Sequence, residues 1–254
     1  MNHKPNPFLA AVRAGKPQIG LWVSLCSPLA AEVVAGAGFD WVLIDMEHSP
    51  NELTTVLNQL QVFAAYDTTP LVRPDWNDTV KVKRLLDIGT QGLLFPMVQT
   101  PAEAAQAVAA VRYPPRGVRG VSGMTRANRF ARSTDYFAKV EAETAVLVQL
   151  ESRSAIEKAH EIAAVDGVTG LFFGPADIGA DMGILGQPAN PAIWDVIMPA
   201  AKSLIRAGVP VGTLVFDATF ARKLLDEGFS FVACGADTAL LARGADNLLK
   251  AVKG

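Results

Sequence analysis

Several side chains that could do chemistry stand at the ends of short apolar runs, where a buried strand would finish. They occur in the segments IDMEH, LVRP, VQLES and GPAD, and they are Asp45, Glu47, His48, Arg73, Glu151 and Asp177. Burying unpaired charge is costly, so such groups are expected to bind a ligand or to pair with one another. Carboxylates beside a histidine and an arginine predict a site for a hard metal, with a base and an anion clamp.

Glu151 and Asp177 are the candidate metal ligands. Two carboxylates suit Mg²⁺ or Mn²⁺, which keep waters or take substrate oxygens in an octahedral shell. A 2-oxo acid could fill two positions with its carboxylate and keto oxygens, and the metal would then act as a Lewis acid that stabilises an enolate. The alternative interpretation is structural, because acidic residues are favoured as helix N-caps at strand–helix turns.

His48 is the candidate base and Arg73 the candidate anion clamp. Asp45 precedes His48 by three positions and could orient the imidazole and raise its basicity. A guanidinium at a strand end can bind a carboxylate or an oxyanion. The alternatives are a hydrogen-bonded structural histidine and an internal salt bridge from Arg73 to Asp45 or Glu47.

Some chemistries are disfavoured by what the strand ends lack. No lysine stands there, so we expect neither a Schiff-base mechanism nor pyridoxal phosphate. The turns TLVFDA and CGADTA each carry an aspartate that would repel a phosphate. No GxGxxG segment follows a predicted strand, so a nicotinamide cofactor is not expected.

The composition is that of an ordinary globular protein. The 254 residues include 23 Lys plus Arg and 25 Asp plus Glu, a balance that argues against nucleic-acid or membrane-surface partners. The N-terminus lacks the apolar run of a signal peptide, and no stretch is long enough to cross a membrane, so we expect a cytoplasmic protein. Cys26 and Cys234 are expected to be core thiols on adjacent strands.

Short β-branched apolar runs alternate with helical segments along the whole chain. Runs that are apolar on both alternating faces are typical of parallel strands covered on both sides. Eight repeats in this length predict one α/β domain over residues 1–254, a (β/α)8 TIM barrel rather than a doubly wound sheet. The expected strands are Ile19–Leu25, Trp41–Met46, Pro70–Arg73, Gly92–Pro96, Ala145–Leu150, Gly170–Phe173, Pro210–Leu214 and Phe231–Cys234, and the expected helices include Glu103–Val111, Ala155–Ala163 and Ala218–Glu227.

The segments DWVLIDMEHSPN, LVRP, KRLLDIGTQGLLFPMV, RYPPRGVRG, VQLES and GPADI together resemble the HpcH/HpaI aldolases, over roughly residues 6 to 250. The resemblance implies a barrel of the phosphoenolpyruvate/pyruvate superfamily type and a class II aldehyde-lyase. Such an enzyme cleaves 4-hydroxy-2-oxo acids reversibly to pyruvate, or a related 2-oxo acid such as hydroxypyruvate, and an aldehyde through a metal-bound enolate. A role in aromatic or sugar-acid catabolism would follow.

The resemblance also implies residue roles. Glu151 and Asp177 would hold Mg²⁺, Mn²⁺ or Co²⁺, and His48 would act as base together with Asp45. Arg73 would bind the pyruvyl oxygens, and Glu47 would support the site without contacting the substrate. The residues expected to contact substrate are Trp22, Gln149, Gly174, Pro175, Ala176 and Leu214, with backbone amides around Gly174 to Ala176 holding the carboxylate.

The resemblance further implies a homo-hexamer, a trimer of dimers with a swapped C-terminal helix. In such an assembly Asp87 and an arginine of the long loop, assigned to Arg126, would reach a neighbour's site, although Arg129 and Arg132 stand close by. Two rival functions stay open. One is a related lyase that acts on coenzyme A thioesters such as citramalyl- or malyl-CoA, and the other is a barrel that binds sugar acids without catalysis.

Overall fold

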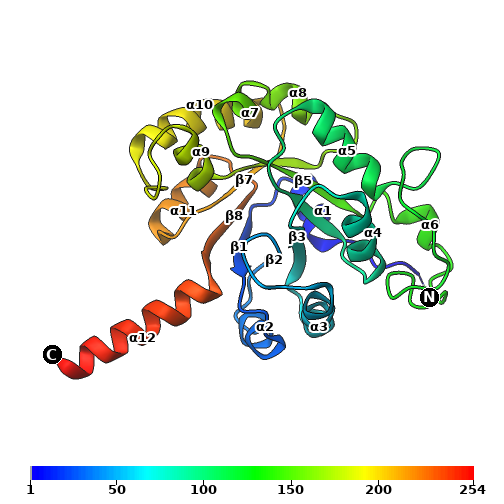
Figure 1. Cartoon of the computed structure of the whole chain (residues 1–254), viewed down its shortest axis with the longest axis horizontal. Coiled ribbons are helices and arrows are strands. Elements are labelled where there is room, and N and C mark those ends of the chain that lie inside the picture. The colour runs from blue at the N-terminus through cyan, green and yellow to red at the C-terminus, as the bar shows by residue number, and fades with distance from the viewer. Residues whose placement is uncertain (1) are drawn as a thin grey trace.

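The computed structural model describes residues 2–254, and in them eight parallel strands form a closed barrel (Figure 1). Each strand pairs with the next along the chain, and the last pairs with the first. This confirms the predicted (β/α)8 fold. The strands are β1 (Gln18–Val23), β2 (Trp41–Asp45), β3 (Thr69–Arg73), β4 (Gly92–Phe95), β5 (Ala145–Leu150), β6 (Gly170–Phe173), β7 (Val211–Leu214) and β8 (Phe231–Ala236).

The predicted strand ends hold to within two residues, and β1 shows why the largest differences arise. The prediction carried β1 to Leu25, but the backbone N–H groups of Ser24 and Leu25 donate to the carboxylate of Asp237, at 2.9 and 3.1 Å, instead of extending the strand. Cys26 then adopts a left-handed backbone with φ of 55°. The expectation that Cys26 lies on a strand is therefore wrong, whereas Cys234 does lie on β8.

Side-chain caps fix where many helices begin. Asn6, Ser27, Asp78, Thr100 and Asp217 each accept a hydrogen bond from a backbone N–H in the first turn of the following helix. The helices are α1 (Pro7–Arg13), α2 (Pro28–Ala35), α3 (Leu53–Phe63), α4 (Thr79–Asp87), α5 (Pro101–Val111), α6 (Tyr136–Lys139), α7 (Arg153–Glu157), α8 (Ala159–Ala163), α9 (Pro175–Asp181), α10 (Pro191–Arg206), α11 (Ala218–Asp226) and α12 (Asp237–Lys253).

One segment that was predicted to be a single helix forms two. The segment Ala155–Ala163 was expected to form a single helix, but it is divided between α7 and α8. The division falls at Lys158, whose φ of −96° and ψ of 8° depart from helical values. The expected helix Glu103–Val111 lies within α5, and Ala218–Glu227 coincides with α11 except for its last residue.

Large aromatic side chains fill the barrel interior because glycines on neighbouring strands make room for them. A Cβ atom on Gly20 would lie 2.2 Å from the Trp41 ring, and one on Gly212 would lie 2.2 Å from the Phe231 ring. Phe8 of α1 packs edge-on against Phe231 and closes the N-terminal end of the barrel. A packed lower half leaves the C-terminal ends of the strands as the open face.

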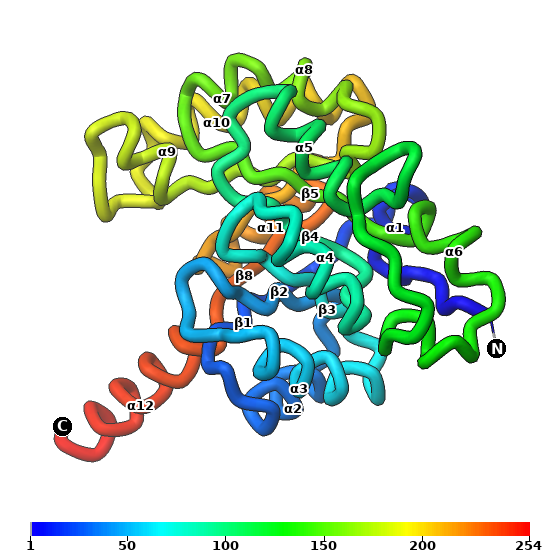
Figure 2. Tube along the Cα trace, turned by 45° about the vertical axis from the view of Figure 1, so that its right-hand side comes forward, coloured from blue at the N-terminus to red at the C-terminus, as the bar shows by residue number. Residues whose placement is uncertain are grey.

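The C-terminal helix α12 leaves the barrel and projects away from it in both views (Figures 1 and 2). Of its side chains, Asp237 at the first position is buried, whereas Leu240, Leu241, Leu248 and Leu249 are exposed. An exposed row of leucines indicates a surface that needs a partner. Within residues 2–254, none of the helices combines the length and the apolar character that crossing a membrane requires.

Candidate active site

A cavity of about 470 Å³ opens at the C-terminal end of the barrel, where the sequence predicted a site. Strands β1, β2, β3, β5, β6 and β7 all bring residues to it, either from their last positions or from the turn that follows. Nine of the predicted site residues line it: Trp22, His48, Arg73, Gln149, Gly174, Pro175, Ala176, Asp177 and Leu214. Side chains from distant parts of the chain meet here because parallel strands end at one face.

Arg73 stands at the centre of a buried ion-pair network. Its Nε and Nη2 donate to the two oxygens of Asp45, at 2.8 and 2.7 Å, and its Nη1 lies 2.8 Å from Oε2 of Glu47. Burial would raise the pKa of Asp45, but the hydrogen bond and charge of Arg73 outweigh burial and hold that pKa below its usual value. The predicted internal salt bridge is therefore confirmed, and Arg73 is held rigidly by both carboxylates.

The Asp45 carboxylate is hydrogen-bonded to Arg73 and makes no direct side-chain contact with His48 in the described residues, so the expected orientation of His48 by Asp45, directly or through water, stays a prediction. The His48 side chain is 65% exposed, and the nearest acid to it is Glu47, with 3.8 Å between Nε2 and Oε2. Asn51 donates to the backbone carbonyl of Asp45 at 2.7 Å and so braces the turn that presents His48. His48 thus presents a solvent-accessible imidazole at the cavity wall and is not a buried structural histidine.

Glu151 is buried and held from two sides. One oxygen accepts a hydrogen bond from the Met97 N–H and the other from the Gln149 side chain, both at 2.6 Å. A Cβ on Gly174 would lie 2.8 Å from Cγ of Glu151, so this position admits only glycine while the carboxylate stays in place. Burial raises the pKa of Glu151 to about 8, and repulsion from Asp177 and Glu47 acts in the same direction. The hydrogen bond from the Met97 N–H lowers this pKa but does not outweigh burial.

Asp177 reaches the same cavity from the first turn of α9. The structural alternative for these two acids is wrong, because Ser152 is the N-cap of α7 and Gly174 that of α9. Within the described residues no three histidine, cysteine or acidic side chains are arranged as a complete ligand set for a metal. Any cation here would therefore need water or substrate oxygens beside Glu151 and Asp177.

Two observations fit a divalent cation at this place. Carboxylates crowd together although Arg73 is already paired, and a cation would relieve their repulsion. The Oε1 atom of Gln149 is buried without a hydrogen-bond donor, which a water held in the cavity could supply. The donor set is all oxygen, as Mg²⁺ and Mn²⁺ prefer.

Five predicted residues do not line this cavity. Asp45, Glu47 and Glu151 are bonded to its lining residues Arg73 and Gln149, whereas Asp87 and Arg126 have no such contact. Asp87 ends α4, and its Oδ1 accepts a 3.0 Å hydrogen bond from Nη2 of the fully buried Arg119. Arg126 donates to the backbone carbonyls of Ile88 and Leu60, at 2.6 and 3.2 Å. Neither Asp87 nor Arg126 lines the cavity of its own chain, and their expected action on a neighbouring subunit stays a prediction.

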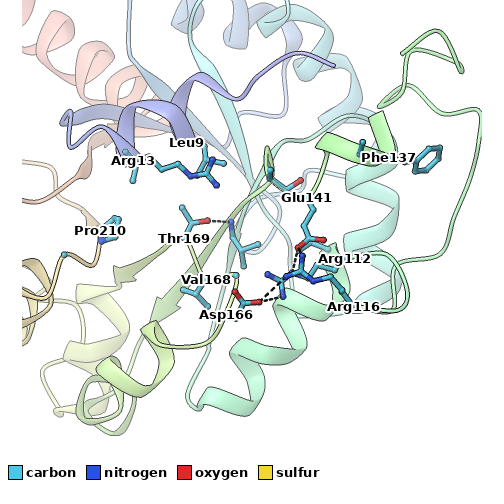
Figure 3. Close-up of a pocket in the computed structure, with 18 residues that line it drawn as sticks. Leu9, Arg13, Arg112, Arg116, Phe137, Glu141, Asp166, Val168, Thr169 and Pro210 are labelled. Atoms are coloured by element: carbon cyan, nitrogen blue, oxygen red, sulfur yellow. Dashed lines mark hydrogen bonds and ion pairs between the residues drawn. The ribbon is translucent and has the colours of Figure 1, made fainter. Parts of the chain in front are cut away.

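A second cavity, of about 670 Å³, opens at the N-terminal end of the barrel between α1, α5 and α6 (Figure 3). Its cations are largely neutralised within the chain. Arg112 binds both Glu141 and Asp166, at 3.0 and 2.8 Å, and Arg116 binds the same two acids, at 2.7 and 3.4 Å. Features at this face of a barrel usually serve stability, and none of the predicted site residues lies here.

Several residues that line the cavity at the C-terminal end of the barrel were not predicted from the sequence. They include Phe172, Pro188, Trp194, Val215, Phe216, Asp217 and Phe220. Trp194 lies inside a helix, and its apolar spacing there looks like ordinary core. Phe216, an aromatic residue two positions after the end of β7 that the structure leaves exposed, was the one local signal that could have indicated a pocket wall.

Comparison with known proteins shows that the chain is similar to members of one family. A family model described as HpcH/HpaI aldolase/citrate lyase matches residues 18–244. The 4-hydroxy-2-oxo-heptane-1,7-dioate aldolase of Escherichia coli is 51% identical over 244 residues, which cover 96% of this chain and 93% of the relative. The protein of the same name from Klebsiella pneumoniae is also 51% identical, with 96% of this chain and 92% of the relative covered.

Solved structures agree with the sequence matches. An HpcH/HpaI aldolase/citrate lyase family protein from Burkholderia cenocepacia J2315 superposes with a TM-score of 0.94 at 39% identity, covering 98% of this chain and 100% of its own. An HpcH/HpaI aldolase from Desulfitobacterium hafniense DCB-2 has a TM-score of 0.89 at 29% identity, with 96% and 95% of the two chains covered.

Proposed function

This chain belongs to the HpcH/HpaI aldolase/citrate lyase family, and we propose that it cleaves 4-hydroxy-2-oxo acids reversibly to pyruvate, or a related 2-oxo acid, and an aldehyde. It is a carbon–carbon lyase of the aldolase type, as the relatives that are 51% identical to it are named. One observation supports the chemistry most strongly. The buried Arg73, the acid Asp177 and the accessible His48 line one cavity, and the buried acid Glu151 is hydrogen-bonded to Gln149, which lines the same cavity.

Glu151 and Asp177 would hold Mg²⁺, Mn²⁺ or Co²⁺. When bound, such a cation would supply Lewis-acid stabilisation of charge that develops on the 2-oxo oxygen. Gln149 fixes one oxygen of Glu151 and the Met97 N–H fixes the other, so the acid is oriented before any ligand arrives. No lysine lines the cavity within residues 2–254, which agrees with a mechanism that forms no Schiff base.

Arg73 would carry the recognition of the 2-oxo acid. Its guanidinium lies in the cavity wall, held by Asp45 and Glu47, and the Trp22 ring covers it with 5.2 Å between the ring centroid and the guanidinium carbon. A cation fixed in this way needs no reorganisation when negative charge develops beside it. We therefore assign to Arg73 the pyruvyl oxygens and the enolate charge.

His48 would remove the proton from the C4 hydroxyl group. The C3–C4 bond then breaks, its electron pair moves into the enolate of pyruvate, and the other fragment leaves as an aldehyde. Protonation at C3 completes pyruvate. The exposed imidazole can exchange its proton with solvent between turnovers.

The active form would be a homo-hexamer, a trimer of dimers in which α12 docks on a neighbouring subunit. The exposed leucines of α12, which have no place on their own barrel, support this proposal. Asp87 would act on the neighbour's site while Arg119 holds its Oδ1. A similar role for Arg126 would require its guanidinium to leave the carbonyls of Ile88 and Leu60. We place the enzyme in the cytoplasm, in the breakdown of aromatic compounds or sugar acids.

A retro-aldol screen tests the proposal. The protein is offered a panel of 4-hydroxy-2-oxo acids, and pyruvate release is followed with Mg²⁺ or Mn²⁺ and with EDTA. We expect release that EDTA abolishes and the metal restores. Trapping of the protein by borohydride in the presence of pyruvate would contradict the proposal, because it needs a lysine imine. Tight binding of metal and pyruvate without any turnover would instead support a binding protein.

A further inference from the structure

Part of the cavity lining has no role in the proposed chemistry. It consists of Pro188 and the aromatic side chains of Trp194 on α10, Phe216 in the turn after β7 and Phe220 on α11. We call Trp194, Phe216 and Phe220 the aromatic wall. The wall lines the same cavity as His48 and Arg73, so it is available to contact the part of a substrate beyond C4.

The aromatic wall offers no polar group to a ligand. The Trp194 and Phe220 rings pack edge-on with centroids 4.6 Å apart, at an interplanar angle of 88°. The indole N–H of Trp194 donates to the carbonyl of Pro188 at 3.2 Å and is therefore satisfied within the chain. Phe216 is 62% exposed at the rim, so a substrate that covered its ring would remove apolar surface from water.

Charge at this end of the cavity is negative. Among the described lining residues the charged or titratable side chains are His48, Arg73, Asp177 and Asp217. Arg73 is already paired with two carboxylates. Asp217, adjacent to Phe216, caps α11 by accepting a 2.6 Å hydrogen bond from the Phe220 N–H. A carboxylate on the aldehyde would thus meet an acid and no free cation from this chain.

We propose that the aldehyde fragment recognised by this enzyme carries an uncharged apolar chain, aliphatic or aromatic, that lies on the aromatic wall, and that Phe216 and Asp217 determine this specificity. The inference rests on the proposed aldolase activity and names its acceptor class. The proposed aldehyde differs from the one that the name of the relatives implies for those proteins. Cleavage of 4-hydroxy-2-oxoheptane-1,7-dioate releases pyruvate and 4-oxobutanoate, an aldehyde that carries a carboxylate.

Two aldehydes of matched shape test the proposal. In 4-methylpentanal an isopropyl group replaces the carboxylate of 4-oxobutanoate, so the pair differs mainly in charge. Aldol addition of each to pyruvate is measured with the complete enzyme in the presence of Mn²⁺. We expect kcat/KM for 4-methylpentanal to be at least equal to that for 4-oxobutanoate, because the wall binds the alkyl group and Asp217 repels the carboxylate.

Variants separate the contribution of the aromatic wall from that of Asp217. Phe216→Ala should lower kcat/KM for 4-methylpentanal by about tenfold, the usual effect of lost apolar contact, with little effect on acetaldehyde. Asp217→Asn, which can still cap α11, should raise kcat/KM for 4-oxobutanoate several-fold and leave 4-methylpentanal unchanged. Phe137→Ala is the matched control, since Phe137 is half-exposed at the other end of the barrel and should change neither value.

Exchange of the pyruvate methyl protons in D₂O, followed by NMR, tests the donor half of the reaction without an aldehyde. Absence of this exchange would overturn the proposed function and the inference together. Normal exchange with a tenfold preference for 4-oxobutanoate, or an equal loss for all aldehydes in Phe216→Ala, would overturn the inference alone. If Arg126→Ala then removed that preference, a neighbouring subunit's cation rather than the aromatic wall would set the specificity.

Discussion

The guanidinium of Arg73 binds both oxygens of Asp45, at 2.8 and 2.7 Å, across the directly paired ends of β2 and β3. We therefore expect Asp45 to act on the reaction through Arg73. In Asp45→Asn one oxygen and the negative charge are lost while the fold around the site is kept. We expect a raised KM for pyruvate and a free energy of unfolding lower by about 3 kcal/mol, the typical cost of breaking a buried ion pair.

Asp166→Asn is the control for this change, because Asp166 pairs with Arg112 on the surface and such pairs contribute about 1 kcal/mol or less. Urea unfolding and steady-state kinetics provide the measurements. A shift of the pH–rate profile in Asp45→Asn, without any rise in KM, would instead favour direct coupling of Asp45 to His48.

His48 can be removed without disturbing the core, since its side chain is 65% exposed. His48→Ala should lower the rate of retro-aldol cleavage by about 100-fold or more, the usual contribution of a general base. Pyruvate binding and the free energy of unfolding should change little. His160→Ala removes another exposed histidine, bonded to Ser203 at 2.9 Å, and should be fully active. Comparable rates for the two variants would exclude His48 as the base.

Gly174 gives Glu151 the space that it occupies. A methyl group at this position would lie 2.8 Å from Cγ of Glu151 and 3.1 Å from its Oε1, so Gly174→Ala must displace the carboxylate. We expect affinity for Mn²⁺ to fall by about tenfold or more, measured by calorimetry. Gly123→Ala is matched to it, since a Cβ there meets nothing within 4 Å, and it should bind Mn²⁺ normally.

The pKa of Glu151 is raised to about 8 from an ordinary 4.5, and this predicts the direction in which stability changes with pH. Thermal unfolding measures that change. Between those pH values the folded protein keeps this proton while the unfolded chain has lost it. Without metal, stability should therefore fall as the pH rises from 5 to 8, by a total on the order of a few kcal/mol. Glu151→Gln should flatten this dependence, and saturating Mg²⁺ should reverse it. A stability that rises with pH in the metal-free protein would contradict the assignment.

The exposed leucines of α12 predict an assembly that charge should disrupt. Leu241→Glu combined with Leu248→Glu should convert a large oligomer to chains of 27.0 kDa, measured by light scattering during gel filtration. Leu185→Glu changes a leucine that is equally exposed in the loop after α9 and should leave the mass unaffected. An unchanged mass in the α12 variant would remove the proposed role of this helix.

Much of the site followed from the sequence because a barrel imposes a simple rule. Parallel strands end at one face, so a polar side chain at the end of an apolar run must lie near the others. His48, Arg73, Gln149 and Asp177 could be placed in one cavity by this rule, and the structure confirms their placement. The burial of Glu151 follows in the same way from its position directly after β5.

Only the tertiary structure decided which of these groups are partners. Asp45 stands three positions from His48 in sequence, yet the strand register sets it opposite Arg73, and a bidentate ion pair outweighs proximity along the chain. The aromatic wall was equally out of reach, because Trp194 and Phe220 come from separate helices and their spacing alone resembles ordinary core. Sequence periodicity determines which face of an element is buried, whereas contacts between distant elements depend on register and helix packing.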